Sequence, residues 1–291
     1  QTVDLVLTAI LANGHVLIEG VPGVAKTLLA RLTARLIDAD FSRVQFTPDL
    51  MPSDVLGTTV FNMKTNGFDF HQGPIFADIV LVDEINRAPA KTQAALFEVM
   101  EERQISIDGT THRMGDLYTI LATQNPVEQE GTYKLPEAQL DRFLMKITMD
   151  YPSLEEEVNI LERHHTNAAL VKLDDIVPAI TKEELLSLRA FMNQVFVDRT
   201  LLQYIALIVQ QTRTSKAVYL GASPRASVAM LQSSKAYALL QGRDFVTPED
   251  IKFVAPYVLQ HRLILTAEAE MEGYSPVKVT QRLIDKVEVP K

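Results

Sequence analysis

The 291-residue sequence contains no cysteine, and no apolar run in it approaches the length that a membrane-spanning helix needs. The absence of cysteine excludes disulfide bonds, thiolate metal sites and cysteine nucleophiles together. A helix needs about 20 mostly apolar residues to cross a bilayer, so we expect no membrane span. Both features are compatible with a cytoplasmic location, which is our expectation.

The sequence also lacks an excess of basic residues. It carries 28 Lys and Arg against 37 Asp and Glu, a formal net charge of −9. An acidic chain has no broad electrostatic attraction to nucleic acid or anionic lipid, so a nucleic-acid partner is not expected. The net charge alone does not exclude a local basic groove. With 47% apolar and 22% charged residues, the composition is that of a globular protein.

The first half of the chain alternates apolar runs with helical patterns. These patterns predict strands at His15–Glu19, Arg43–Phe46, Ile79–Val82 and Tyr118–Ala122, and helices at Gln1–Leu11, Thr27–Asp38 and Ala90–Glu102. Alternating strands and helices are typical of βαβ units, which build a parallel sheet. The first helix has no N-cap residue before it, so we expect the natural chain to begin earlier.

The pattern changes near Asp150-Tyr151-Pro152. From there on it is mostly helical, with segments at Leu185–Phe196, Leu201–Thr212 and Pro224–Leu240. We therefore predict an α/β domain at residues 1–149 and an all-helical domain at residues 150–291, with a boundary accurate to about four residues.

A glycine-containing loop, Gly20 to Thr27, joins the first predicted strand to the next helix. A phosphate-binding loop occurs in this context, because its backbone N–H groups surround the phosphates and the following helix offers its positive N-terminus. Lys26 would bring a positive charge to the β- and γ-phosphates, and Thr27 a hydroxyl to Mg²⁺. The predicted nucleotide-binding residues are Gly20, Val21, Pro22, Gly23, Val24, Ala25, Lys26, Thr27 and Leu28. An ordinary strand-to-helix turn with an exposed lysine is the alternative for the loop taken alone.

One residue departs from the general phosphate-loop pattern, because Ala25 stands where a glycine usually precedes the lysine. If that position is helical, alanine costs nothing there, and glycine would be the poorer helix former. On that premise the departure weakens the pattern but leaves the chemistry of the loop intact.

Two acidic residues, Asp83 and Glu84, follow the apolar run Ile79–Val82. Ligands bind at the carboxyl ends of strands in open α/β sheets. Asp83 would hold Mg²⁺, directly or through water, and Glu84 would orient and deprotonate the attacking water. Alone, the pair would be an ordinary polar turn, but after a phosphate loop it indicates a site of ATP hydrolysis.

Five segments together closely resemble the MoxR family of AAA+ ATPases. They are Glu19–Thr27 (EGVPGVAKT), Asp83–Ala88 (DEINRA), Met100–Gln104 (MEERQ), Ala122–Pro126 (ATQNP) and Leu135–Phe143 (LPEAQLDRF). In that family an alanine before the lysine is the usual form, which accounts for Ala25. A weaker match, at Gly221–Arg225 (GASPR) and Thr247–Ile251 (TPEDI), extends into the second half. The resemblance implies an α/β P-loop NTPase (AAA+) core with a parallel sheet, followed by an all-helical lid domain.

The resemblance implies roles for three more residues. Asn125 resembles the polar sensor that helps to position the hydrolytic water, with an Asn-Pro turn as its alternative. Arg142 resembles the arginine finger, which completes the site of a neighbouring subunit and neutralises charge on the transferred phosphoryl group. Its alternative is a surface arginine beside Phe143. Arg225 resembles the second sensor, which reaches from the lid to the γ-phosphate, and its alternative is an arginine in the first turn of a helix.

An arginine finger that acts in trans requires self-association, so the resemblance implies a ring, and we expect a hexamer. It also implies a client protein, which in this family often carries a von Willebrand A-type domain. The segments Pro48–Gly73 and Gln104–Arg113 resemble an insertion in the second helix and a hairpin before the sensor strand. Both are candidates for client contact, with plain surface structure as the alternative.

The predicted function is Mg²⁺-dependent hydrolysis of ATP to ADP and phosphate, coupled to remodelling or maturation of a partner protein or complex. Three alternatives stay open. A magnesium-chelatase-like motor subunit belongs to the same branch, a nucleic-acid-dependent AAA+ motor shares the fold, and a nucleotide-dependent scaffold would bind ATP and barely hydrolyse it. The acidic charge disfavours the second alternative, and the presence of Glu84 disfavours the third.

Overall fold

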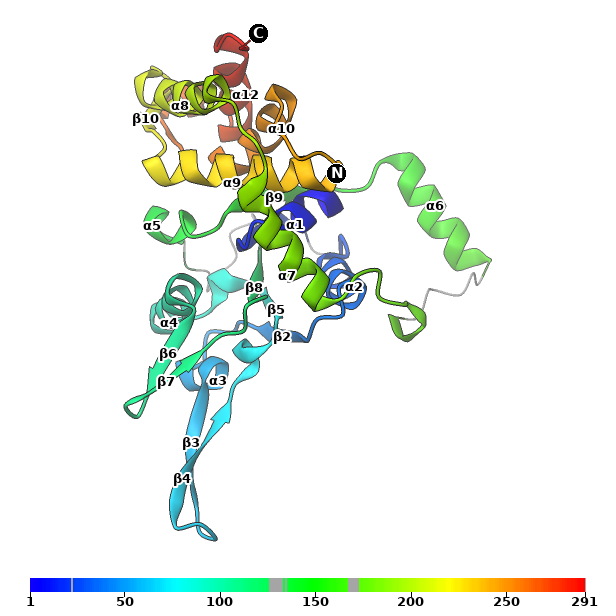
Figure 1. The fold of residues 1–291 in the computed structure, drawn as a ribbon, viewed down its shortest axis with the longest axis vertical. Coiled ribbons are helices and arrows are strands. Elements are labelled where there is room, and N and C mark those ends of the chain that lie inside the picture. Colours follow the sequence, from blue (N-terminus) through cyan, green and yellow to red (C-terminus); the bar gives the residue numbers. More distant parts are fainter. Residues whose placement is uncertain (22, 126–132, 134, 167–172, 291) are drawn as a thin grey trace. The chain divides into compact units, whose positions relative to one another are not determined.

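The computed structural model describes residues 1–21, 23–125, 133, 135–166 and 173–290 (Figure 1). They form two compact units, each assembled from separate stretches of the chain. The sheet unit comprises Leu17–Lys134 and Thr148–Leu186, and the helical unit comprises Gln1–Val16, Leu135–Ile147 and Ser187–Lys291. Because these units are defined by compactness alone, the boundary expected near residue 150 between two domains stays a prediction.

Five strands form a sheet in the order β2-β5-β8-β1-β9. Their bounds are Phe41–Gln45 (β2), Ile79–Asp83 (β5), Thr119–Gln124 (β8), Val16–Gly20 (β1) and Met145–Met149 (β9). β5 pairs in parallel with both β2 and β8, and every residue of β5 is buried. A strand covered on both faces needs a continuous apolar run, which is the pattern of Ile79–Val82. The parallel sheet predicted from the sequence is confirmed.

The sheet unit also contains helices and hairpins. The helices are α2 (Lys26–Leu36), α3 (Pro52–Leu56), α4 (Ala90–Glu102) and α6 (Leu154–His165), with short 3₁₀ turns at Pro74–Phe76 (η1), Ile85–Arg87 (η2) and Leu173–Asp175 (η3). Two antiparallel hairpins are β3–β4 (Gly57–Asn62 with Gly67–Gln72) and β6–β7 (Gln104–Ile107 with Thr110–Arg113). The second hairpin turns at Asp108 and Gly109, whose φ values are 49° and 77°. Positive φ at both positions is what a two-residue type I′ turn requires.

The helical unit is built mainly from helices. They are α1 (Thr2–Leu11), α5 (Glu137–Leu140), η4 (Met192–Gln194), α8 (Arg199–Thr214), α9 (Pro224–Leu240), α10 (Pro248–Leu259), α11 (Ala267–Met271) and α12 (Pro276–Lys286), while α7 (Lys182–Phe191) has residues in both units. α9 contacts α1, α8 and α10, and α10 contacts α12. A capping box between Thr247 and Asp250 begins α10, where it satisfies N–H groups that the helix itself leaves unbonded.

Two short strands also belong to the helical unit. β10 (Val218–Leu220) pairs antiparallel with β11 (Ile264–Leu265). The sequence pattern predicted only helices here, because strands of two or three residues show too little alternation to be recognised.

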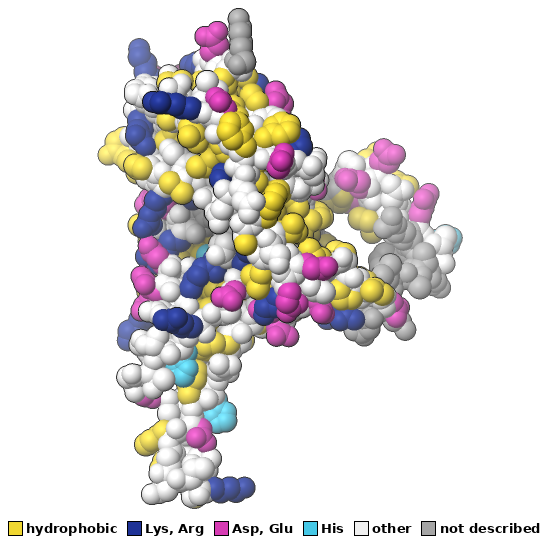
Figure 2. Space-filling model, in the orientation of Figure 1, with side chains coloured by type: hydrophobic (Ala, Val, Ile, Leu, Met, Phe, Trp, Pro, Cys, Tyr) yellow, Lys and Arg dark blue, Asp and Glu magenta, His cyan; other side chains and the backbone are white. Residues whose placement is uncertain are grey.

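None of the helices that the structure describes is long and apolar enough to cross a membrane. On the face drawn in Figure 2, Lys and Arg side chains are interspersed with Asp and Glu side chains. The mixed charge on this face agrees with the acidic net charge, and it offers no broad basic surface of the kind that follows a nucleic-acid backbone.

Candidate functional site

Two carboxylates lie at the carboxyl end of the central strand β5. In the parallel pairing, Gln45 of β2 is opposite Asp83, and Ala122 of β8 is opposite Val82. Because parallel strands end at the same edge of a sheet, side chains from all three strands meet there. Asp83 is 8% exposed, and Glu84 follows it with left-handed backbone dihedrals of φ 56° and ψ 51°.

Thr123, on the neighbouring strand β8, bonds to both acidic residues. Its hydroxyl donates to Asp83 Oδ1 at 2.7 Å and accepts from the backbone N–H of Glu84 at 2.9 Å. The side chain is buried, at 1% exposure. A hydroxyl that donates and accepts at once fixes the direction of the Asp83 carboxylate. It also holds Glu84 in a backbone conformation that L-residues otherwise disfavour.

The remaining contacts of the acidic pair come from two arginines and an amide. Arg43 of β2 donates to Asp83 Oδ2 from Nε at 2.9 Å and from Nη2 at 2.7 Å. Glu84 Oε2 accepts from Gln45 Nε2 at 2.9 Å and lies 3.0 Å from Arg87 Nε. Hydrogen bonds between charged groups are the stronger ones. A metal ion or a water molecule that uses the same oxygens therefore has to compete with these side chains.

The loop between β1 and α2 contains two residues with positive φ, Gly23 at 90° and Ala25 at 59°. Ala25 is the N-cap residue of α2 and lies in the left-handed region, with ψ 27°. The premise that this position is helical is therefore wrong. The left-handed conformation costs alanine about 1–2 kcal/mol, a cost that glycine avoids. Ala25 is a strained residue at the start of the helix, and its favourable helix propensity is not used.

Lys26 is the first residue of α2, and its ammonium reaches back to the loop. Nζ donates to the carbonyl oxygen of Gly20 at 2.5 Å. Burial lowers the pKa of Lys26, and the negative charges of Asp83, Glu84 and Glu19 oppose that shift. The side chain lies beside the loop, where its ammonium can bind anionic oxygens of a phosphate.

The loop and the strand ends enclose a cavity of about 340 Å³. Cavities of this size hold small ligands. Most of the predicted site residues line this cavity, namely Gly23, Val24, Ala25, Lys26, Thr27, Asp83, Glu84 and Asn125. Arg43, Gln45 and Thr123 complete the wall. The structure thus brings the phosphate loop, the acidic pair and the predicted sensor Asn125 together.

The other predicted site residues lie elsewhere. Gly20 ends β1, Val21 follows it, and Leu28 is 47% exposed on α2. Pro22 lies outside the described residues. Arg142 lies between α5 and β9, and Arg225 is in the first turn of α9, both in the helical unit. Their approach to the cavity stays a prediction.

A second cavity, of about 590 Å³, shares Gly23, Val24 and Ala25 with the first. The segment after β9 and the first turns of α6 form the rest of its wall, with Met149, Asp150, Tyr151, Pro152, Glu156, Asn159 and Ile160. This lining mixes apolar side chains with carboxylates and an amide, which suits a flat heterocycle joined to a polar sugar. Sequence reasoning missed this cavity, because its two walls are far apart in the chain and no motif marks the second.

Sequence reasoning also missed Arg43, Gln45 and Thr123. Each stands in or at the end of a predicted strand, and polar residues at the carboxyl ends of parallel strands are the signal that could have found them. The strand order was needed as well, because only that order shows which strands flank β5.

Comparisons with known proteins identify the family of the chain. Residues 15–145 match the ATPase family associated with various cellular activities (AAA), and residues 210–285 match the AAA lid domain. The protein YeaC of Bacillus subtilis is 48% identical over 98% of this chain and 88% of its own length. Chaperone MoxR1 of Mycobacterium tuberculosis is 44% identical over 100% of this chain and 78% of its own length. A candidate ATPase from Cytophaga hutchinsonii, known from its crystal structure, is 41% identical and superposes with a TM-score of 0.90 over 100% of this chain and 90% of that one. The chain belongs to the MoxR family of AAA+ ATPases.

Proposed function

We propose that the protein hydrolyses ATP to ADP and phosphate in a Mg²⁺-dependent reaction and uses the released free energy to remodel or mature a partner protein. The observation that carries the proposal is the convergence of Lys26, Thr27, Asp83, Glu84 and Asn125 on one cavity. They supply a cation, a hydroxyl, a metal-binding carboxylate, a general base and an amide that orients water. Phosphoryl transfer depends on positioning and on neutralising charge, and these are the groups that do both.

The two adjoining cavities suit different parts of ATP. The phosphates would lie in the cavity of about 340 Å³, against Lys26 and the loop. The base and the ribose would lie in the cavity of about 590 Å³, between the loop and α6. The shared wall, Gly23 to Ala25, is where the two parts of the ligand would join.

Thr27 and Asp83 fit a magnesium ion. Both offer oxygen ligands on the wall of the same cavity, and Mg²⁺ prefers such ligands together with water and phosphate oxygens. When bound, the ion would neutralise charge that develops on the phosphate oxygens. Arg43 lies 2.7 Å from Asp83 Oδ2, so its guanidinium would have to yield or share that oxygen.

Glu84 is the proposed general base. Its Oε2 accepts from Gln45 at 2.9 Å and lies 3.0 Å from Arg87. A carboxylate takes a proton from water only when the water is within hydrogen-bonding distance, so at least one of these donors has to give way. Asn125 lies on the same wall and would hold that water in line with the γ-phosphate.

Arg142 and Arg225 are proposed to complete the site. Arg142 would act on ATP bound to a neighbouring subunit as an arginine finger, and Arg225 would contact the γ-phosphate as the second sensor. In this scheme residues 1–149 form the nucleotide-binding domain and residues 150–291 form the lid domain. The working form is then a ring, which we take to be a hexamer.

A client protein is the proposed target of the ring. The relative MoxR1 is named a chaperone, and a protein with a von Willebrand A-type domain is one candidate client. The hairpin β3–β4 exposes Phe61 (48%), Met63 (86%) and Phe68 (73%). Exposed apolar side chains of this kind are suited to contact another protein. We expect the protein to act in the cytoplasm, where its substrate ATP is supplied.

Steady-state ATP hydrolysis over a range of protein concentrations is the first test, with Arg142→Ala beside the wild type. We expect specific activity to rise with concentration, and Arg142→Ala to bind ATP with little turnover. Arg199→Ala removes an exposed arginine at the start of α8 and is the matched control, with normal activity expected. Flat activity per subunit together with a normal Arg142→Ala would refute the ring.

Two further variants test the site itself. Lys26→Ala should lose ATP binding, and Glu84→Gln should bind ATP without hydrolysing it. Normal hydrolysis by either variant would show that the catalytic site has been assigned to the wrong residues.

A further inference from the structure

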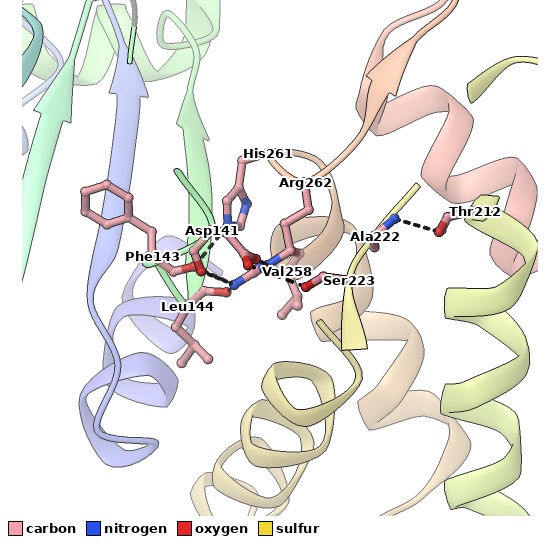
Figure 3. Close-up of polar contacts among 9 residues, drawn as sticks. All are labelled: Asp141, Phe143, Leu144, Thr212, Ala222, Ser223, Val258, His261 and Arg262. Atoms are coloured by element: carbon pink, nitrogen blue, oxygen red, sulfur yellow. Dashed lines mark hydrogen bonds and ion pairs between the residues drawn. The ribbon is translucent and has the colours of Figure 1, made fainter. Parts of the chain in front are cut away.

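Arg262, which follows α10, binds the chain segment that carries Arg142 (Figure 3). Its side chain is 4% exposed, and Nε donates to Asp141 Oδ1 at 2.6 Å. Its terminal nitrogens donate to the carbonyl oxygens of Asp141 at 3.1 Å, Phe143 at 2.7 Å and Leu144 at 3.2 Å. A single guanidinium therefore holds the backbone on both sides of Arg142.

The two residues before Arg262 bind the same segment. His261 Nε2 lies 3.0 Å from the carbonyl oxygen of Phe143, and Gln260 Nε2 donates to the carbonyl oxygen of Lys146. Burial and the positive charge of Arg262 hold the pKa of His261 well below its usual value. A carbonyl oxygen only accepts hydrogen bonds, so this contact requires the proton to be on Nε2. Three consecutive side chains thus fix the backbone of residues 141–146.

Asp141 connects this segment to the start of α9. Its Oδ1 accepts from Arg262, and its Oδ2 accepts from Ser223 Oγ at 3.4 Å. Ser223 is the N-cap residue of α9, and Arg225 is in the first turn of that helix. One carboxylate therefore joins the segment that carries Arg142 to the segment that carries Arg225.

The chain just before α9 is held against α8. The backbone N–H of Ala222 donates to Thr212 Oγ1 at 3.0 Å, as Figure 3 shows, and Arg213 Nε donates to the carbonyl oxygen of Ala222 at 2.9 Å. A Cβ added to Gly221 would lie 2.8 Å from the Cα of Arg213. Only glycine permits so close an approach. The start of α9 is thus a fixed point to which Asp141 is attached.

A role in stability alone does not explain this arrangement well. Buried ion pairs add little net stability, because the desolvation of both charges offsets their attraction. Arg243 and Asp250 show the simpler arrangement in the same unit, a bidentate pair with distances of 2.6 and 2.7 Å. Arg262 directs three bonds to carbonyl oxygens that flank a single residue, Arg142.

We propose that Arg262 is a positioning residue for ATP hydrolysis: it sets the direction in which Arg142 is presented to the neighbouring subunit. Through Asp141 and Ser223 it also couples that direction to the segment carrying Arg225. The inference rests on the proposed trans-acting role of Arg142. Displacement of a catalytic group by about 1 Å can lower a rate about 100-fold, so such support has a measurable effect.

Two substitutions of Arg262, each measured as a pure variant, test the inference. Arg262→Met removes all donors, and Arg262→Lys keeps the charge but replaces the planar fork with one ammonium. We expect kcat to fall roughly 10- to 100-fold in Arg262→Met, and less in Arg262→Lys. The KM for ATP and the affinity for nucleotide should change by no more than about twofold, because the substitution does not touch the nucleotide cavity. A raised KM with unchanged kcat would overturn the inference.

Arg243→Met is the matched control, because it breaks an ion pair to the buried Asp250 in the same unit without touching residues 141–146. Arg243→Met should lower the melting temperature and leave kcat unchanged. If Arg243→Met lost as much kcat as Arg262→Met, the effect of Arg262→Met would be one of general destabilisation. Asp141→Asn keeps the shape of the side chain and is the variant to use where Arg262→Met does not fold. The same loss of kcat is expected from it, and normal turnover by Asp141→Asn would overturn the inference.

Mixing of subunits separates this inference from the proposed function. Arg262→Met subunits keep their own Lys26 and Glu84 but present a misdirected Arg142, whereas Glu84→Gln subunits present a well-directed one. Mixed rings should therefore hydrolyse more ATP than either pure variant. A mixture of Arg142→Ala with Glu84→Gln is the positive control, and Lys26→Ala with Glu84→Gln, two defects of one site, should show no recovery.

The two mixtures give distinguishable failures. If Arg142→Ala recovers with Glu84→Gln and Arg262→Met does not, the inference about Arg262 is wrong and the proposed function stands. If neither mixture recovers, Arg142 does not act in trans, and the inference about Arg262 falls with that role.

Discussion

Replacement of Thr123 by valine removes the hydroxyl that connects β8 to the acidic pair. Valine has nearly the shape of threonine, so Thr123→Val deletes two hydrogen bonds without opening a large cavity. The lost bonds are those to Asp83 Oδ1, at 2.7 Å, and from the backbone N–H of Glu84, at 2.9 Å. Because Thr123 is 1% exposed, water cannot easily take the place of the hydroxyl.

The expected loss of stability follows from the two bonds. A hydrogen bond to a charged group contributes about 1.5–3 kcal/mol, and one between neutral groups about 0.5–1.5 kcal/mol. Asp83 is 8% exposed, so solvent screens the first bond only weakly. The sum is about 2–4.5 kcal/mol, which corresponds to a fall in melting temperature of roughly 3–7 °C for a protein of this size.

Thermal unfolding and ATP turnover should be measured on the wild type, Thr123→Val and the control Thr123→Ser. Serine keeps the hydroxyl, so its melting temperature should stay near that of the wild type. Thr123→Val should unfold earlier and also hydrolyse ATP more slowly, because Glu84 loses the bond that holds its left-handed backbone. The reasoning is refuted if Thr123→Val matches Thr123→Ser in both measurements.

Three further substitutions are informative. Arg43→Ala should raise the affinity for Mg²⁺ at saturating ATP by roughly fivefold, because Arg43 competes with the ion for Asp83. The Arg43 side chain is half-exposed, so its ion pair with Asp83 contributes only about 1 kcal/mol. An unchanged Mg²⁺ titration would contradict this. Ala25→Gly should leave the melting temperature unchanged or raise it, because glycine adopts the left-handed conformation without cost. In a helical position, glycine would instead destabilise the protein by about 1 kcal/mol. A lowered melting temperature would therefore contradict the left-handed conformation. Gly20→Ala should lower the melting temperature, because its Cβ would meet the carbonyl oxygen of Met149 at 2.7 Å; a stable variant would show that the two strands can separate without cost.

Local sequence patterns were enough to predict the elements that hold the site. The helices Ala90–Glu102 and Pro224–Leu240 begin and end at the predicted residues, and each of the four predicted strands is present with its ends shifted by no more than two residues. These features depend on the spacing of apolar residues along a short stretch, which can be read directly from the sequence. The same holds for Lys26, Thr27, Asp83 and Glu84, whose predicted convergence follows from strand ends that meet at one edge.

The partners of those residues could not be predicted in the same way. Arg43 contacts Asp83 because β2 lies beside β5, and strand order depends on the packing of the whole sheet. The left-handed backbone of Ala25 was missed because propensity favours a helical alanine, whereas the geometry of the loop overrides that preference. Each of the two compact units joins stretches that are distant in the chain, which a pattern of neighbouring residues does not show.

The contacts of the acidic pair explain where control of hydrolysis can lie. Carboxylates that are largely buried need counter-charges, and Arg43 and Arg87 supply them. Catalysis needs the same oxygens for a metal ion and for water, so binding exchanges one set of ionic contacts for another. The free energy of that exchange is the difference between the energy of the contacts with Arg43 and Arg87 and the energy of the contacts with the metal ion and water. These two energies are similar, so a small change in either one alters affinity and rate. Arg43 is 49% exposed, so its replacement disturbs the core little. At Arg43, function is therefore more sensitive than stability to substitution.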